Sequence, residues 1–339
     1  MISLKKIKDQ LEKSENPLIL YDDDPDGLCS YLLLKRSFPK ASGFIVKSSP
    51  YVTEEIVPLI RNYYPDLIVI VDKPVVTQDF VDKIAVPIIW IDHHPIIKLK
   101  GVTYFNPRLK DPEDNRPTTH WCYNLVKKDM WIAAIGIISD WAKPSFFKKF
   151  VKEYPGLADE NAKKEDVLFS SELGNLIKIF DFILKNNTST INKCVNVLTR
   201  IETPYEIINQ ETKEGKYIYS NAKKFAKRYD DLFAKAIKIK PDGNIVIFTY
   251  TTKLTSFTGE IANALNYKHK DKVIFVGRQK EDRINFSLRS EKIKVRPILD
   301  KAIKGLDGSG GGHDFACGGN ILSRDFSEFI EKVRKYVNK

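Results

Sequence analysis

Short apolar runs alternate with amphipathic stretches through the first third of the chain. Apolar runs of about five residues predict buried strands at 17–21, 43–47, 67–71, 87–91 and 102–105. The segments between them predict helices at 27–38, 53–63 and 77–84. Strands that alternate with helices form βαβ units, so this part of the chain is expected to fold as a mostly parallel sheet.

The remaining sequence predicts a helical middle and a second strand-rich region. Residues 118–140 fit two helices, and the lysine-rich stretch from Lys143 to about Lys240 has few strand signals. A turn at Pro241-Asp242-Gly243 then precedes strands expected at 244–250, 272–277 and 284–290 and helices expected at 257–267 and 325–337. The predicted fold class is α/β, with a mostly parallel sheet domain at 1–145, a helical region and connector at 146–240, and a smaller α/β domain at 241–339.

Acidic and imidazole residues follow four of the apolar runs. They are Asp22-Asp23-Asp24-Pro25-Asp26-Gly27, Asp72, Asp92-His93-His94 and Asp140. The carboxyl ends of parallel strands border the ligand crevice of an open α/β sheet, so these side chains are expected to converge. Crowded carboxylates repel one another unless cations hold them, and oxygen ligands with one or two imidazoles suit Mn²⁺ or Mg²⁺ better than a structural zinc.

Each motif also has a simpler interpretation. On its spacing alone, the Asp22 to Gly27 segment fits a solvated loop that caps a helix equally well, and Asp72 and Asp140 are weak signals individually. The Asp92-His93-His94 triplet is more specific, because two of the five histidines of the chain meet at one strand end. Asp72 is the candidate for a carboxylate that bridges two cations.

A glycine-rich run lies near the end of the chain, at Gly308-Ser309-Gly310-Gly311-Gly312-His313. It is too rich in glycine for a helix or a strand interior, so we expect a loop whose amides bind an anion, with a flexible linker as the alternative. The run follows the predicted strand that carries Ser287 and Arg289, and a guanidinium suits bidentate contact with phosphate. The phosphate-binding candidates are therefore Ser287, Arg289, Gly310, Gly311, Gly312 and His313.

Composition narrows the class of protein. The formal net charge of +11 favours a polyanionic partner such as nucleic acid, although many basic proteins are merely soluble. No apolar run is long enough to span a bilayer and the first residues lack a signal-peptide core, so we expect a cytoplasmic protein without membrane contact. The widely spaced Cys29, Cys122, Cys194 and Cys317 are expected to be free thiols.

Taken together, these motifs resemble those of the DHH-family phosphoesterases that carry a C-terminal DHH-associated domain. The resemblance rests on DDDPDG, VDKP at Asp72, IDHHP at Asp92, YFNPR, IGIISD ending at Asp140, NFSLRS and GSGGGHDFACGG, which occur in this order over most of the chain. It implies two Mn²⁺ ions, with Mg²⁺ or Co²⁺ as alternatives, in the first domain and a second domain that grips nucleic acid or nucleotide. The abundance of lysine and isoleucine fits an archaeal source, and equally an AT-rich genome.

The resemblance also assigns roles to the residues. The implied metal site comprises Asp22, Asp24, Asp26, Asp72, Asp92, His93 and Asp140, with Asp92 also a candidate for orienting a ligand. Asp72, His93, His94 and Asp140 are the implied catalytic residues, and His94 also contacts the substrate. One position departs from the family, because relatives commonly have a histidine in the first motif where this chain has Leu20 and Asp22.

Three functions are consistent with the sequence. The favoured one is a RecJ-like exonuclease that degrades single-stranded DNA or RNA from an end by a two-metal mechanism. The second is an enzyme for short substrates, such as a nanoRNase, a cyclic-dinucleotide phosphodiesterase or a nucleoside bisphosphate phosphatase. The third is a non-catalytic nucleic-acid-binding scaffold for replication. A replication or repair protein would be a natural partner, and the sequence predicts neither polarity nor oligomeric state.

Overall fold

The computed structural model of this chain describes residues 2–47, 50–253 and 255–338. The chain divides into two compact units, Met1–Lys223 and Lys224–Lys339. The boundary between them falls inside the long helix α12 (Lys213–Ala236). Each unit contains its own five-stranded sheet and its own apolar core.

The sheet of the first unit confirms the predicted mostly parallel sheet, and all its strand pairs are parallel. Its strand order is β2-β1-β4-β6-β7. The strands are β1 (Pro17–Asp22), β2 (Ser42–Val46), β4 (Leu67–Val71), β6 (Ile88–Ile91) and β7 (Val102–Phe105). Every residue of β4 and β6 is buried, which is expected of central strands in a sheet that helices cover on both faces.

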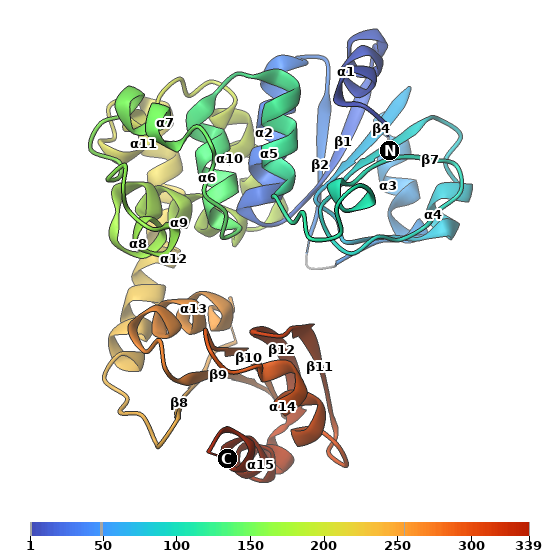
Figure 1. Cartoon of the computed structure of the whole chain (residues 1–339). Coiled ribbons are helices and arrows are strands. Elements are labelled where there is room, and N and C mark those ends of the chain that lie inside the picture. Colours follow the sequence, from blue (N-terminus) through green and yellow to red (C-terminus); the bar gives the residue numbers. More distant parts are fainter. Residues whose placement is uncertain (1, 48–49, 254, 339) are drawn as a thin grey trace. The chain divides into compact units, whose positions relative to one another are not determined.

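Helices cover the two faces of this sheet (Figure 1). On one face lie α2 (Pro25–Ser37), α5 (Thr118–Val126) and α6 (Met130–Ser139), with α1 (Leu4–Lys13) beside α5. On the other face lie α3 (Val57–Arg61) and α4 (Gln78–Asp82), beside the short strands β3 (Tyr51–Val52) and β5 (Val75–Val76). The predicted helix at 53–63 is shorter than expected, because its first turn is a 3₁₀ turn at Glu54–Ile56.

Close packing of α2, α5 and α6 depends on Gly136. A Cβ atom at Gly136 would lie 2.7 Å from the Cβ of Cys29 in α2 and 2.3 Å from Oγ1 of Thr119 in α5. Both distances are shorter than a van der Waals contact. Glycine therefore allows three helices to meet at one point, and two of them carry polar residues of the crevice described below.

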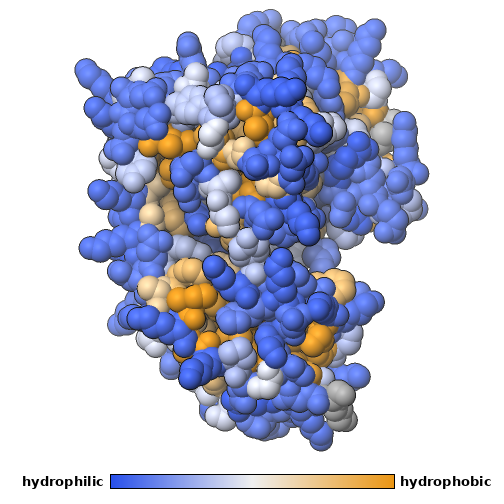
Figure 2. Space-filling model, turned by 60° about the vertical axis from the view of Figure 1, so that its left-hand side comes forward, coloured by the Kyte–Doolittle hydropathy of each residue, from blue (hydrophilic) through white to orange (hydrophobic). Residues whose placement is uncertain are grey.

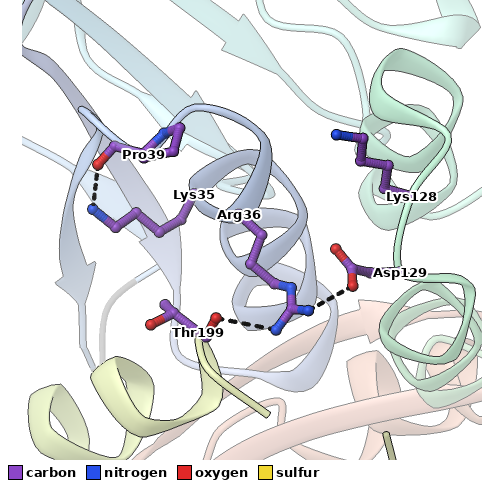
Figure 3. A pocket seen from close by; sticks show the side chains of 6 residues that line it. All are labelled: Lys35, Arg36, Pro39, Lys128, Asp129 and Thr199. Atoms are coloured by element: carbon purple, nitrogen blue, oxygen red, sulfur yellow. Dashed lines mark hydrogen bonds and ion pairs between the residues drawn. The ribbon is translucent and has the colours of Figure 1, made fainter. Parts of the chain in front are cut away.

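The predicted helical middle of the chain is also present. It consists of α7 (Phe147–Glu153), α8 (Lys164–Ser170), α9 (Glu172–Leu184), α10 (Thr188–Leu198), α11 (Tyr205–Ile208) and α12. Arg36, near the end of α2, contacts residues at the end of α10 and at the start of α6. It lines an open hollow of about 640 Å³ (Figure 3). Its guanidinium pairs with Asp129 at 2.8 Å and donates to the carbonyl groups of Leu198, Thr199 and Ile201 at 2.7–3.3 Å.

The second unit is a mixed sheet with helices on both faces. Its strand order is β11-β12-β10-β9-β8, in which only β8 and β9 are parallel. The strands are β8 (Ile245–Thr251), β9 (Val273–Lys280), β10 (Arg283–Arg289), β11 (Gly308–His313) and β12 (Ala316–Leu322). Helix α13 (Thr258–Lys268) packs on β9 and β10, while α14 (Val295–Ala302) and α15 (Phe326–Val337) cover the opposite, phenylalanine-rich face.

The prediction of a loop for the glycine-rich run is wrong. Residues 308–313 form the edge strand β11, which pairs antiparallel with β12. The partner strand has glycines of its own, and a Cβ at Gly319 would lie only 2.4 Å from the carbonyl oxygen of Ser309. A Cβ at Gly308 would likewise lie 2.6 Å from the carbonyl oxygen of Asn320. The glycines thus permit an unusually close approach of the two backbones.

Two further expectations concern the surface and the thiols. In the part of the chain that the structure describes, no helix combines the length and the apolar character needed to cross a membrane. The face shown in Figure 2 is mostly hydrophilic, with scattered apolar side chains. All four cysteines are buried, and none of them forms a disulfide within the described residues, as predicted.

Candidate metal centre

The chain order of the sheet creates a crevice at the carboxyl end of β1. From β1 the chain moves first to β2 on one side and later to β4 on the other. Open α/β sheets bind their ligands at such a reversal, outside the carboxyl ends of the strands. Asp22 ends β1, Asp72 directly follows β4 and Asp92 directly follows β6, so all three lie at this edge of the sheet.

Asp26 is held by the N-terminus of α5. It lies in the first turn of α2 and is 2% exposed. The backbone N–H groups of Thr118 and Thr119 donate to its two carboxylate oxygens at 2.9 and 2.8 Å, and Oγ1 of Thr119 donates to its carbonyl oxygen at 2.9 Å. A helix N-terminus stabilises a carboxylate, which explains how this charge is buried without a cationic side chain.

Asp72 occupies a sharp turn after β4. Its φ angle of +60° lies in the left-handed region, which aspartate tolerates better than most residues. The residue is 2% exposed, and its carboxylate accepts a hydrogen bond from Oγ1 of Thr118 at 3.0 Å. Thr118 therefore contacts both Asp26 and Asp72 and sets the spacing between the two carboxylates.

His93 projects its Nε2 atom among three carboxylates. The Nδ1 atom lies 3.2 Å from the carbonyl oxygen of Asn115, which accepts only from a protonated nitrogen, so Nε2 carries the lone pair. Nε2 lies 3.5 Å from Oδ1 of Asp72, 3.6 Å from Oδ2 of Asp140 and 4.0 Å from Oδ2 of Asp26. Burial lowers the pKa of His93 to about 4, so the imidazole is neutral and can act as a ligand.

Two groups of side chains that share His93 could each hold a divalent cation. One ligand atom from each of Asp26, His93 and Asp140 lies within 4.8 Å of the others, and the same holds for Asp72, His93 and His94. Ligands about 2.1 Å from a common octahedral ion lie roughly 3–4 Å from one another, so the observed spacing needs little adjustment. Three carboxylates with one imidazole is a donor set that suits Mn²⁺.

The charges of the cluster also call for a cation. Burial raises the pKa of Asp26, and burial together with the charges of Asp26 and Asp24 raises the pKa of Asp72 well above its usual value. The pKa of Asp140 rises for the same reasons. Carboxylates that are disfavoured as anions regain their charge when a cation binds between them.

His94 faces the same crevice but is held differently. Its Nδ1 donates to Oδ1 of Asp92 at 2.8 Å, and its backbone N–H donates to the other oxygen at 3.0 Å. Asp92 is fully buried and also accepts from Nδ2 of Asn106 at 3.5 Å. Its carboxylate is thus turned toward His94, and Asp92 is in neither ligand set of the described residues.

The aspartates of the first motif, Asp22 to Gly27, have different partners. Asp24 is the N-cap of α2, where its Oδ1 accepts from the N–H of Gly27 at 2.9 Å, and it is solvent-exposed. Asp22 pairs with the buried Lys73, whose Nζ lies 2.7 Å from Oδ1 of Asp22. Neither aspartate belongs to the ligand sets found among the described residues.

Several residues of the centre were not identified from the sequence. Thr118, Thr119 and Asn115 position the ligands, and Lys73 neutralises Asp22. The only sequence signals for them were the helix start at Pro117-Thr118-Thr119 and the lysine within VDKP. Asn115 acts through its backbone carbonyl, so its side chain carries no signal at all.

In the second unit, strand register aligns the predicted phosphate-binding residues. Arg289 and His313 both pair with Ala316, and Ser287 and Gly311 both pair with Gly318. Directly opposed residues lie on the same face of a sheet, so two rows run across β10, β12 and β11. Gly310 falls between these rows, and a Cβ there would approach Leu299 on the opposite face.

Arg289 is the most firmly positioned of these residues. Its Nε donates to Oδ1 of Asn263 on α13 at 2.8 Å, and one terminal nitrogen donates to the carbonyl groups of Leu288 and Cys317 at 2.8 and 2.9 Å. Burial lowers the pKa of its guanidinium. His313, in contrast, is exposed at the edge strand.

Comparison with known families identifies the second unit. Residues 247–339 match the family model of the DHHA1 domain. No curated protein sequence matches this chain. The family evidence from sequence therefore covers the C-terminal part of the chain.

Solved structures share the fold of nearly the whole chain. RecJ from Thermus thermophilus in complex with Mn²⁺ is 16% identical, with a TM-score of 0.67 over 98% of this chain and 54% of RecJ. The DHH domain of a protein described as a member of a ribosomal-protein family is 16% identical, with a TM-score of 0.70 over 99% of this chain and 89% of that one. The pGpG-specific phosphodiesterase PggH from Vibrio cholerae is 13% identical, with a TM-score of 0.54 over 95% and 99%. This chain thus spans about half the length of the RecJ chain.

Proposed function

We propose that this chain, which has the fold of RecJ and of DHH-domain proteins and carries a DHHA1 domain, hydrolyses phosphodiester bonds with the help of a divalent cation. The observation that carries the proposal is that carboxylate oxygens of Asp26, Asp72 and Asp140 all lie within 4.0 Å of Nε2 of His93, at the carboxyl edge of the parallel sheet. The proposed ion is Mn²⁺, with Mg²⁺ or Co²⁺ as alternatives.

Asp26, Asp72, His93 and Asp140 would hold the cation. When bound, a divalent cation there would polarise a phosphoryl oxygen and lower the pKa of water. The protein supplies the geometry in advance, because Thr118 and Thr119 hold Asp26 and Thr118 also holds Asp72. Preorganised ligands avoid the cost of ordering during the reaction.

His94 would act on the substrate. Although burial disfavours its charged form, the hydrogen bond and charge of Asp92 raise the pKa of His94. In its protonated form, His94 would donate to a phosphate oxygen and offset the negative charge that develops there. In this scheme Asp92 positions His94 and does not bind the metal.

Arg289 is the proposed contact to a phosphate of the substrate. Ser287, His313 and the backbone of Gly310, Gly311 and Gly312 are the further candidates. The support is its geometry, since Asn263 and two carbonyl groups fix the guanidinium plane. β11 is an edge strand, so strand pairing uses only one side of its backbone. The other side leaves N–H groups for a substrate.

We favour single-stranded DNA or RNA, degraded from an end, as the substrate. The net charge of +11 supports this choice, because the metal centre itself is acidic and the excess of positive charge must lie elsewhere on the chain. The shared fold with a pGpG-specific phosphodiesterase supports a second candidate, hydrolysis of short oligonucleotides or dinucleotides.

One assay tests both candidates. The full chain is incubated with Mn²⁺ and with single-stranded DNA and RNA ladders of increasing length, labelled at either end, and with a linear dinucleotide. Stepwise shortening from one end of long strands supports the exonuclease, whereas a rate that falls sharply beyond a few nucleotides supports the short-substrate enzyme. Salt-dependent binding without turnover would instead indicate a scaffold.

A pair of variants ties the activity to the centre. Asp72→Asn should abolish hydrolysis, while Asp79→Asn, the same change at an exposed aspartate of α4, should leave it intact. Full activity of the Asp72→Asn variant would show that the reaction takes place elsewhere.

A further inference from the structure

Lys73 is a fully buried lysine at the edge of the acidic centre. Its side chain is 0% exposed, and its Nζ donates to Oδ1 of Asp22 at 2.7 Å. Burying an ammonium group without a compensating charge costs several kcal/mol, so a buried lysine requires an anionic partner. Asp22 in its ionised form supplies that charge.

The backbone directs Lys73 to this place. The preceding Asp72 turns the chain with its left-handed conformation, and the following Pro74 restricts Lys73 to extended backbone. The carbonyl oxygen of Lys73 accepts a hydrogen bond from Nε1 of the buried Trp90 at 3.0 Å. The backbone of Lys73 is therefore fixed beside the end of β1, within reach of Asp22.

β1 offers no other ligand on this side of the centre. Leu20 lies two residues before Asp22, and thus on the same face of the strand, and it is fully buried in the apolar core with Trp90. The Oδ1 atom of Asp22 already accepts from Lys73 and from the N–H of Asp23 at 2.8 Å. A divalent cation on Asp22 would lie within a few ångströms of the ammonium and be repelled by it.

We propose that the ammonium of Lys73 takes the place of a second divalent cation, so that the centre binds one ion through Asp26, Asp72, His93 and Asp140. This inference rests on the proposed metal-dependent function and revises the expectation of two ions. Asp22 is then the counter-ion of Lys73 and not a metal ligand.

The test is the manganese content of the full chain. Equilibrium dialysis against Mn²⁺ followed by metal analysis should give one ion per chain. The electron paramagnetic resonance spectrum should be that of an isolated Mn²⁺ ion, without the exchange coupling of a pair. Two tightly bound, coupled ions in the wild-type protein would overturn the inference, and this result does not depend on any variant.

Variants test the role of Lys73 directly. Lys73→Met frees Asp22 and should raise the content to two ions, whereas Lys83→Met, the same change at an exposed lysine, should leave one. Asp22→Asn should change the affinity for Mn²⁺ by less than about threefold, whereas Asp26→Asn should lower it by at least about 100-fold. A folded Lys73→Met protein with one ion, or a large loss of affinity in Asp22→Asn, would refute the proposal.

The charge-balanced double variant Asp22→Asn with Lys73→Met controls for folding. It removes both charges and should return the content to one ion, and two ions in this variant would show that Asp22 is not the ligand that Lys73 blocks. The proposed function fails in a different way, because a wild-type chain that binds no Mn²⁺ at all would contradict metal-dependent hydrolysis itself.

Discussion

The Nδ1 atom of His93 lies 3.2 Å from the carbonyl oxygen of Asn115, a residue in the loop that leads into α5. This contact selects the tautomer whose Nε2 faces Asp72 and Asp140. A backbone group thus orients the ligand, and the side chain of Asn115 takes no part in that hydrogen bond.

His93→Gln should lower the affinity for Mn²⁺ by at least about 100-fold, because the centre loses its only neutral nitrogen ligand among the four described side chains. Asn115→Ala is the matched control and should keep nearly full affinity, since it retains the carbonyl group. Titration with Mn²⁺, followed calorimetrically, measures both. Equal losses in the two variants would mean that the loop, and not the ring, determines binding.

Thr118→Val should weaken Mn²⁺ binding by roughly 10–100-fold, because it removes the hydroxyl group that donates to Asp72. Thr118→Ser keeps that hydroxyl and should bind close to normally. The backbone N–H groups that hold Asp26 remain in both variants. Similar affinities for the valine and serine variants would show that this hydrogen bond does not matter.

The metal-free protein should lose stability, relative to Asp22→Asn, as the pH rises from about 4 to about 7. Burial and the charge of Asp24 raise the pKa of Asp22 to about 7, although Lys73 acts in the opposite direction. When folding raises the pKa of a carboxyl group, the group stabilises the fold fully at a pH below its pKa in the unfolded chain. This contribution is lost as the pH rises through its pKa in the folded protein.

Chemical denaturation of both proteins in a chelating buffer, repeated across this pH range, measures the effect. Both proteins carry the same histidines, so the difference between their free energies of unfolding reports Asp22 together with its electrostatic coupling to Asp24 and Asp72. The expected change is on the order of a few kcal/mol. A difference that stays constant with pH would mean that Asp22 titrates normally in the folded state.

Arg36→Met should lower the free energy of unfolding by roughly 2–4 kcal/mol. The change removes the partner of Asp129 and the donor to three carbonyl groups, at a side chain that is only 16% exposed. Figure 3 shows the contacts of Arg36 with Asp129 and Thr199. Arg200→Met is the control, because its ion pair with Glu214 is long and exposed and should contribute less than about 1 kcal/mol. Thermal and urea denaturation measure both losses of stability. Equal losses in the Arg36 and Arg200 variants would contradict the structural role of Arg36.

Arg289→Met should raise KM for an oligonucleotide by roughly 10–100-fold. This factor corresponds to the binding free energy of one or two charge-assisted hydrogen bonds. The affinity for Mn²⁺ should stay the same, because Arg289 belongs to the second unit. Arg324→Met, at an arginine whose side chain is 75% exposed, controls for the loss of charge. A lower kcat with unchanged KM would contradict a role in binding.

Much of the fold follows from local patterns. The parallel strands and the helices between them were predictable because a fully buried strand must be apolar over its whole length and its crossover must be helical. β4 and β6 illustrate this, since all their residues are buried. β11 could not be predicted from local patterns. Its glycines form a strand because the small residues of the neighbouring β12 allow the two backbones to approach closely.

The same division applies to the metal centre. The sequence alone shows that acidic and imidazole side chains such as Asp72 and His93 follow buried strands. Parallel pairing of these strands then brings the side chains to one edge of the sheet. The pairing of Lys73 with Asp22, 51 residues apart, and the hold of Thr118 on Asp26, 92 residues away, exist only in the folded state. The local apolar runs determine where each strand ends. Residues this distant in the sequence come into contact only when whole elements pack together, and this packing decides which counter-charge lies beside a buried charge.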